Sequence, residues 1–307
     1  MNEDLFPNLE QMLAPMRQEW PAPRTADWRG NASQQQSFKA YRVSRPARQT
    51  AQRRALYLSR VGEFTAVQQA VVTATADFLA RFLDLPLRRG ADFDPATFPP
   101  YVIRPHPLRG HSQLLTGSLI NDVLALDRPA AALIYLAVTA WDLCSDEHGH
   151  DPWGSGFGEA WYGHAGVWSL RYVGDPSRSD RAFRGCLRRS CALATHESLH
   201  VLGLDHCADL PCLMRGSACL SAPLQLCPPC FRKLCWNRQL DLLPYLERIR
   251  DFLAAWAFSE DVQRVDRMIR LLAKKPWKRR PRSGPQEQVS PRQSGGEQGA
   301  TADRPRE

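Results

Sequence analysis

The stretch His196-Glu-Ser-Leu-His-Val-Leu-Gly-Leu-Asp-His206 decides how the rest of this 307-residue chain is interpreted. On a helix, residues four apart share a face, so His196 and His200 can direct their imidazoles at one point. Gly203 can adopt a positive φ at low cost and end the helix sharply, which would return His206 to the same side. Three imidazoles around an open fourth position are a ligand set of catalytic zinc, and we therefore expect a zinc ion here.

Glu197 follows the first histidine, one position further around the helix. From there its carboxylate can reach a water on the metal without binding the metal itself, which is the place of a general base. Zinc lowers the pKa of a bound water to about 7. The pattern therefore predicts hydrolysis by a zinc-activated water, with Glu197 as the catalytic residue. A helix with two surface histidines that ends at a glycine is the alternative interpretation.

The cysteines are unevenly distributed, because eight of the nine lie within residues 186–235. The N-terminus, Met1-Asn-Glu-Asp-Leu, carries acids where a secretory signal carries bases, so we expect an intracellular, cytoplasmic protein. Reducing compartments keep thiols free of disulfides. The cluster therefore favours metal ligation.

The residues after His206 extend the motif. Cys207 comes next, followed by Cys212, Leu213-Met214 and, further on, Cys227-Pro-Pro-Cys230. This arrangement resembles the archaemetzincins, whose pattern is H-E-x-x-H-x-x-G-x-x-x-C-x-x-x-x-C-x-M, a spacer and then C-x-x-C. Its first part is shared with the wider metzincin motif. Every fixed residue up to Met214 is present at the right interval.

The resemblance implies a compact α/β (α+β), metzincin-like domain with a mixed twisted sheet, an active-site helix and two zinc ions. It implies that Met214 forms a turn beneath the catalytic zinc. It also implies that the second, structural zinc is bound by the four thiolates of Cys207, Cys212, Cys227 and Cys230. The activity implied is that of a zinc metallopeptidase, aminopeptidase-like on short peptides.

The second half of the cysteine site departs from the family pattern. Here 12 residues separate Met214 from Cys227, where the family spacer has about 17. Cys219 or Cys235 could therefore replace one of the four ligands. A zinc-binding interaction module without catalytic activity is the alternative function.

Net charge argues against nucleic acid as the main partner. Residues 274–307 contain nine Lys or Arg and four Asp or Glu, so they carry +5 of the total charge of +8. A nucleic-acid-binding fold is expected to carry its basic patch on the folded body. A basic-tailed nucleic-acid binder is thus a second alternative, and the run Lys274–Arg282 leaves nuclear import open. The most apolar run, residues 130–138, is far shorter than the roughly 20 residues of a membrane span.

Composition divides the chain into a loosely structured N-terminal arm (1–60), the zinc metallopeptidase domain (61–273) and a disordered basic tail (274–307). Apolar spacing predicts helices within 61–83, 113–126, 181–202, 240–258 and 259–273. Two apolar runs, 132–143 and 167–173, predict strands. His106, His111 and His164 are isolated in the sequence and predict no site.

Overall fold

The computed structural model describes residues 8–19, 35–145, 156–208, 210, 212–216, 220 and 222–274. Its larger sheet has five strands in the order β2-β1-β5-β8-β7. In chain order these are β1 (Ala55–Val61), β2 (Leu87–Phe93), β5 (Ala132–Thr139), β7 (Gly158–Ala160) and β8 (Gly166–Ser169). Strands β2, β1, β5 and β8 run parallel to one another, and β7 runs antiparallel to β8 at one edge. All eight residues of β5 are buried, as its continuous apolar run predicts for a strand covered on both faces.

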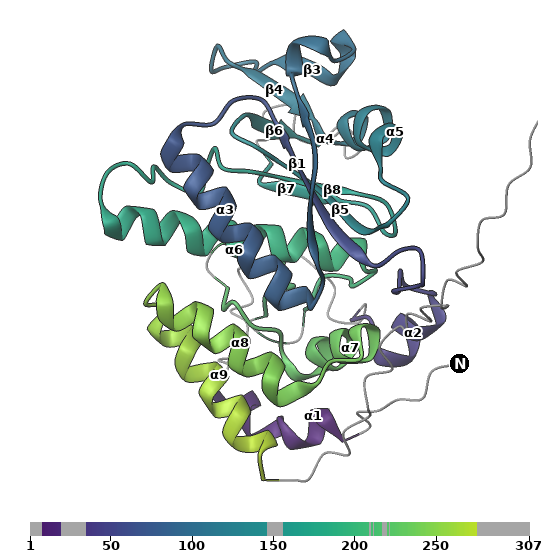
Figure 1. Ribbon diagram of the computed structural model, residues 1–307, viewed down its shortest axis with the longest axis vertical. Helices are drawn as coiled ribbons and strands as arrows, with labels where there is room; N and C mark the ends of the chain where they lie inside the picture. Colours follow the sequence, from purple (N-terminus) through teal and green to yellow (C-terminus); the bar gives the residue numbers. More distant parts are fainter. Residues whose placement is uncertain are drawn as a thin grey trace, which may run out of the picture. The chain divides into compact units, whose positions relative to one another are not determined.

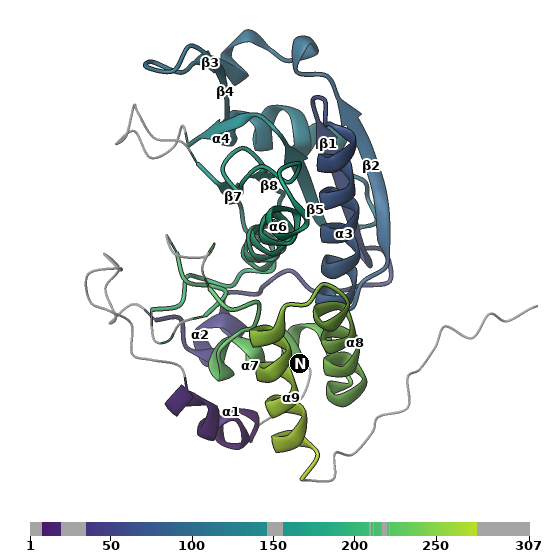
Figure 2. The same cartoon turned by 90° about the vertical axis from the view of Figure 1, so that its left-hand side faces the viewer.

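Two helices cover one face of this sheet. They are α3 (Ala66–Leu83) and α6 (Asp180–Val201), which pack against each other (Figures 1 and 2). Thr65 caps α3 by accepting from the Gln68 N–H, and Ser179 caps α6 by accepting from the Ala182 N–H. Both helices therefore begin at a defined hydroxyl, which fixes where the histidines fall on α6.

Side chains on the other face of β5 pack against a run of short helical segments. These are α4 (Thr116–Leu119), the π-helical turn Ile120–Leu124 and α5 (Ala125–Asp127). Their buried residues form one apolar core with Tyr135 and Ala137. The predicted α/β class is therefore confirmed.

A smaller sheet contains β3 (Ile103–Pro105), β4 (Ser112–Leu115) and β6 (Asp142–Cys144). Residues 113–115 are thus part of a strand, and the predicted helix starts only after them, because they pair with β3 and β6. The predicted strand over 132–143 is two strands. Thr139 Oγ1 accepts the Trp141 N–H (3.1 Å) and turns the chain between them.

Three helices lie within residues 228–272. The predicted pair is present as α8 (Leu242–Ala255) and α9 (Ser259–Leu272), while α7 (Pro228–Arg238) has no counterpart in the prediction. A short α1 (Leu9–Met12) packs against α7. No helix among the described residues is both long and apolar enough to cross a membrane.

The prediction of a loosely structured arm over residues 1–60 is wrong for residues 35–60. Residues 38–43 form α2 (Phe38–Val43), which packs against α7, and β1 pairs on both sides within the larger sheet. The sequence pattern did not reveal β1, because arginines flank and interrupt its apolar residues. Residues 35–49, which we call the brace, follow α7 to its C-terminal end: Gln36 accepts from Lys233, Tyr41 accepts from Asn237, and Arg48 donates to the Trp236 carbonyl. The described residues belong to one compact unit, and the predicted tail lies outside them from residue 275 onward.

Candidate metal centres

The three histidines of the motif come from the end of α6 and the loop after it. His196 and His200 share one face of the helix, and Gly203 follows it with a φ of +84°. The Gly203 N–H donates to the His200 carbonyl (2.7 Å), which closes the helix. The chain then reverses, and His206 returns beside the other two rings.

The Nε2 atoms of the three rings face one point. The Nε2 atom of His196 lies 3.0 Å from that of His200 and 3.2 Å from that of His206. Tetrahedral zinc with Zn–N bonds of about 2.0–2.1 Å places its nitrogens about 3.3 Å apart. The rings therefore have the spacing of ligands around one small cation.

The hydrogen bonds of the Nδ1 atoms show which nitrogens of His196 and His200 carry a proton. His196 Nδ1 donates to the Leu213 carbonyl (2.8 Å), and His200 Nδ1 donates to the Leu204 carbonyl (2.7 Å). A neutral ring protonated on Nδ1 has a lone pair and no proton on Nε2. The short Nε2···Nε2 contacts are then repulsive, and a cation between them removes the repulsion. The same Nδ1 bonds orient metal-binding histidines generally.

Burial keeps these rings neutral. It lowers the pKa of His196 to about 4 and the pKa of His200 well below its ordinary value. Neighbouring rings lower both further, because adjacent positive charges repel. Burial also lowers the pKa of His206. Neutral imidazole is the form that binds metals.

Glu197 lies on α6 between the two histidines and is only 5% exposed. Burial raises its pKa well above the ordinary value, and the charge of Glu159 raises it further. The carboxylate lies against β7, where a Cβ added to Gly158 would be 2.7 Å from Oε1 of Glu197. Strand β7 and helix α6 thus enclose this carboxylate.

Tyr162, which sequence analysis missed, also reaches this site. Its ring stacks on His200 with 6.2 Å between centroids and 25° between planes. Its hydroxyl donates to the Asp205 carboxylate, next to His206. The loop between β7 and β8 carries Tyr162, and only the sheet brings this loop to α6, so no local pattern could have revealed it.

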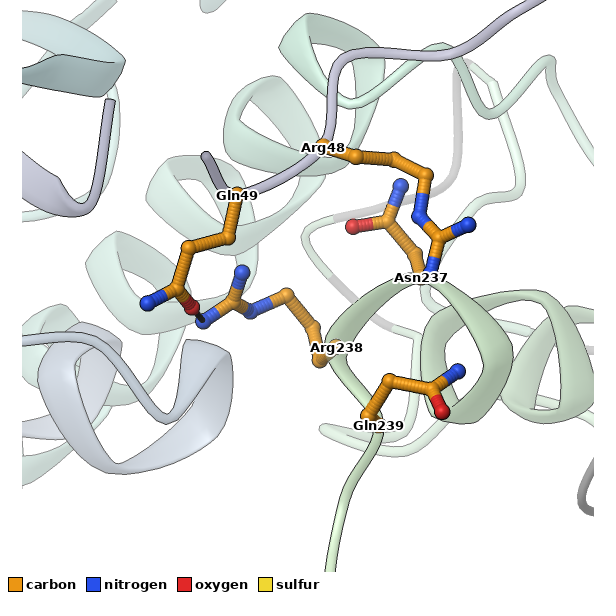
Figure 3. A pocket seen from close by; sticks show the side chains of 5 residues that line it. All are labelled: Arg48, Gln49, Asn237, Arg238 and Gln239. Atoms are coloured by element: carbon orange, nitrogen blue, oxygen red, sulfur yellow. Dashed lines mark hydrogen bonds between the residues drawn. The ribbon is translucent and has the colours of Figure 1, made fainter. Parts of the chain in front are cut away.

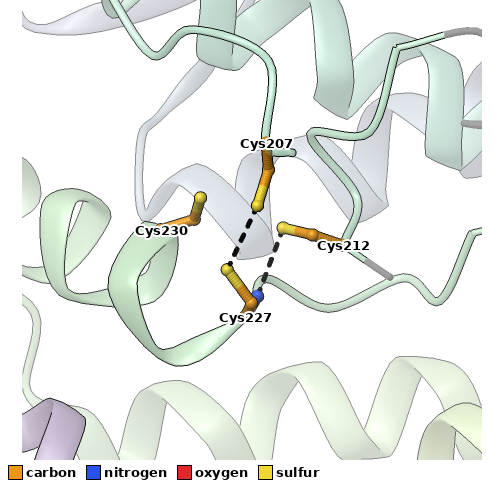
Figure 4. Close-up of side chains that lie close together, drawn as sticks. All are labelled: Cys207, Cys212, Cys227 and Cys230. Atoms are coloured by element: carbon orange, nitrogen blue, oxygen red, sulfur yellow. Dashed lines mark hydrogen bonds between the residues drawn. The ribbon is translucent and has the colours of Figure 1, made fainter. Parts of the chain in front are cut away.

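The four predicted cysteines also converge (Figure 4). All are buried, none forms a disulfide, and their Sγ atoms lie within 4.8 Å of one another: Cys207, Cys212, Cys227 and Cys230. The Sγ atoms of Cys207 and Cys227 are 3.6 Å apart. A disulfide would need about 2.05 Å, whereas sulfurs around tetrahedral zinc, with Zn–S bonds of about 2.3 Å, lie about 3.8 Å apart.

Charge gives a second reason to place a cation among these thiols. Hydrogen bonds from Cys212, Cys227 and Cys230 lower the pKa of Cys207. Burial raises the pKa values of Cys212 and Cys227 well above ordinary. One thiolate therefore suppresses ionisation of its neighbours, and a divalent cation is what lets several ionise together.

Cys235 and Cys219 are the alternative ligands for the cysteine site, and of these two the structure describes only Cys235. Cys235 is buried on α7 but is not one of the four clustered cysteines. Burial raises its pKa well above ordinary, which suits a neutral core thiol. Cys219 lies outside the described residues.

A third group that the sequence did not predict contains His106, His111 and Asp142. His106 Nδ1 accepts the backbone N–H groups of Leu108 (3.0 Å) and Arg109 (3.2 Å). The proton of the neutral ring is then on Nε2, which leaves no lone pair for a metal. His111 Nε2 contacts Asp142 Oδ2 at 2.9 Å. This group fits a polar link between the β3–β4 hairpin and β6.

No protein-family model matches the chain. Archaemetzincin-2 of Rattus norvegicus is 54% identical to it over 52 residues, which cover 16% of this chain and 14% of that protein. Archaemetzincin-2 of Homo sapiens is 52% identical over 52 residues. The chain is a relative of the archaemetzincins. This confirms the resemblance that the motif indicated.

Archaemetzincin-1 of Homo sapiens matches a longer region, with 31% identity over 155 residues, 40% of this chain and 30% of that protein. The chain thus matches less than a third of the length of each of these archaemetzincins. A crystal structure of archaemetzincin from Methanopyrus kandleri shares 21% identity and a TM-score of 0.49, covering 62% of this chain and 99% of that one. A zinc-dependent peptidase from Methanocorpusculum labreanum shares 18% identity and a TM-score of 0.39, covering 64% and 100%.

Proposed function

We propose that this archaemetzincin relative is a zinc metallopeptidase with two zinc ions per chain. His196, His200 and His206 hold the catalytic ion, and the cysteine cluster holds the structural one. The observation that carries the proposal is the convergence of three Nε2 atoms, together with the buried carboxylate of Glu197, the residue that follows His196 on the same helix. Zinc supplies a Lewis acid there, which polarises a scissile carbonyl and acidifies water.

Glu197 is the proposed catalytic residue. Its carboxylate accepts a proton from the attacking water and later donates it to the departing amine. Its close approach to Gly158 on β7 restricts where this carboxylate can lie. Such placement is worth a large factor in rate, because proton transfer needs a fixed short distance.

The proposed substrate is a peptide. Family resemblance supports aminopeptidase-like action on short peptides. The clustered free thiols support an intracellular, cytoplasmic location. Nuclear import through the basic run remains open. A panel of short peptides, each with a free or an acetylated N-terminus, tests the aminopeptidase part. Hydrolysis of the free forms alone supports it, and equal hydrolysis of both forms contradicts it.

The decisive experiment is Glu197→Gln in the full chain, with zinc content and peptide turnover measured together. We expect zinc content to be unchanged and turnover to fall by at least about 10²-fold, the usual share of a general base. Glu63→Gln, at an exposed position, is the matched control and should keep full turnover. Undiminished turnover in Glu197→Gln would refute the assignment. A wild-type chain with zinc but no turnover would favour the interaction module.

A further inference from the structure

A pocket lies where the brace meets the C-terminal end of α7. It encloses about 370 Å³ and is lined by Arg48, Gln49, Asn237, Arg238 and Gln239 (Figure 3). Its lining thus comprises two arginines and three residues with side-chain amides, with no carboxylate among the described residues that line it. A ligand with this environment must carry negative charge and accept hydrogen bonds.

Arg238 has one nitrogen without an acceptor. The residue is 7% exposed; its Nε donates to the Leu83 carbonyl (2.8 Å), and its Nη2 donates to Gln49 Oε1 (2.9 Å) and to the Asp84 carbonyl (3.2 Å). Its Nη1 is buried and has no hydrogen-bond partner among the described residues. The hydrogen bonds of Nε and Nη2 therefore cap the end of α3. They give no structural reason for the burial of Nη1. Buried donors without acceptors are rare in folded proteins.

Arg48 adds a second positive charge. Its guanidinium lies 4.1 Å from the centroid of the Trp236 ring, and its Nη2 donates to the Trp236 carbonyl (3.3 Å). Burial lowers the pKa of Arg238 to about 10; the charge of Asp84 opposes this, and the charge of Arg48 adds to it. Both arginines are charged at pH 7 and repel each other, so an anion between them would stabilise both.

Asn237 restricts further which ligands fit the pocket. Its Nδ2 donates to the Tyr41 hydroxyl (2.8 Å) and to the Ala47 carbonyl (2.9 Å), which assigns the amide orientation. Its Oδ1 is buried and lacks a hydrogen-bond partner among the described residues. A ligand that satisfies the whole pocket therefore accepts from the arginines and donates one hydrogen bond to Asn237. A hydrogen phosphate group has both properties, whereas sulfate has no donor.

We propose that this pocket binds a hydrogen phosphate group between Arg48 and Arg238. The group is either free phosphate or part of a small phosphomonoester, since the pocket is larger than one phosphate. Bound there, it links the brace to α7. The proposal does not depend on the peptidase assignment.

The test is calorimetric titration of the zinc-loaded full chain with sodium phosphate, with sodium chloride and sodium sulfate at matched ionic strength. We expect one saturable phosphate site per chain and at least fivefold weaker sulfate binding. A small phosphomonoester such as glycerol phosphate distinguishes the two sources, because tighter binding of the ester indicates the larger ligand. No saturable phosphate binding, or equal affinity for sulfate, would overturn the proposal.

Two variants test whether phosphate binds in this pocket. Arg48→Gln should weaken phosphate binding at least tenfold. Arg42→Gln is the matched control, because Arg42 lies over the same Trp236 ring (5.6 Å) without lining the pocket, and it should bind as the wild type does. Phosphate that binds Arg48→Gln normally is bound elsewhere, at the zinc or the tail, and this result refutes the proposal. If Arg48→Gln folds poorly, amide hydrogen exchange of residues 47–49 in the wild type replaces that measurement. Phosphate should slow that exchange, and an unchanged rate contradicts the site.

Discussion

Gly158 on the edge strand β7 touches the carboxylate of Glu197 on α6. A Cβ at this position would lie 2.7 Å from Glu197 Oε1 and 2.9 Å from the Val167 carbonyl of β8. Neither atom can yield easily, because one belongs to a buried side chain and the other to the paired strand. The absence of a side chain at Gly158 therefore allows β7 and α6 to approach this closely.

Gly158→Ala should damage activity more than stability. We expect the added methyl to displace Glu197, with peptide turnover falling about tenfold or more and zinc content unchanged. Overpacking should reduce the free energy of unfolding by about 1–3 kcal/mol. Turnover, zinc content and denaturant unfolding, measured on one preparation, check this prediction.

Gly156→Ala is the matched control for that variant. Gly156 lies two residues earlier, and a Cβ there would meet its nearest atom at 3.5 Å, an ordinary contact. Its turnover should remain near that of the wild type. Equal losses in both variants would mean that the segment, and not the contact with Glu197, is sensitive.

Cys207→Ser should destabilise the folded protein. Serine is a poor zinc ligand, and binding of zinc by four thiolates is coupled to folding. We expect one zinc to be lost per chain, with lower soluble yield and a lower melting temperature. Cys235→Ser, a buried α7 cysteine outside the cluster, should keep both zinc ions. A Cys207→Ser chain that melts normally with one zinc missing would contradict the structural role.

Asp261→Ala should be among the most destabilising changes in α9. The Asp261 side chain is 2% exposed; its carboxylate pairs with Arg188 (2.8 Å) and accepts the Leu224 N–H (3.0 Å). Removing it leaves the Arg188 guanidinium without its carboxylate partner, although Nη2 keeps the Ala222 carbonyl (3.0 Å), and it takes the acceptor from the Leu224 N–H. We expect a cost of about 3–5 kcal/mol. Asp266→Ala on the same helix is the control. Asp266 is 36% exposed and 4.0 Å from Arg250, so its loss should cost less than about 1 kcal/mol. Urea unfolding of the two variants would show whether they differ in this way.

Tyr162 should tune zinc affinity. Tyr162→Ala removes both the ring stacked on His200 and the bond to Asp205, whereas Tyr162→Phe removes the bond alone. Groups that orient metal ligands typically contribute about 10–100-fold in affinity. Competition with a zinc chelator should therefore rank the wild type first, Phe second and Ala last. Identical zinc affinity in all three would show that Tyr162 only packs.

Sequence could predict those parts of the site that depend on neighbours along the chain. The spacing of His196 and His200 follows from helical periodicity, and the reversal to His206 follows from one glycine. The cysteines are close to one another in sequence. Each of these relationships is local, so a motif is enough to predict it.

The remaining parts depend on contacts between distant segments. Tyr41 meets the Leu202 carbonyl across 161 residues, and Tyr162 reaches Asp205 across 43. The pairing of β1 with β5 was hidden for the same reason, since its partner strand lies more than 70 residues away. The meeting of His106 with Asp142 likewise needs the smaller sheet to form first. No pattern within a short window reports such contacts.

The brace also affects what a shortened gene product could do. Translation that began after residue 49 would still encode every histidine and cysteine of the two proposed zinc sites and every described strand. The product would lack Tyr41 and Gln36, which hold the Leu202 and Gly203 carbonyls at the turn before His206. It would also leave the ammonium of Lys233 buried without the acceptors on Gln36. An intact motif in a truncated isoform is therefore no guarantee of a working enzyme.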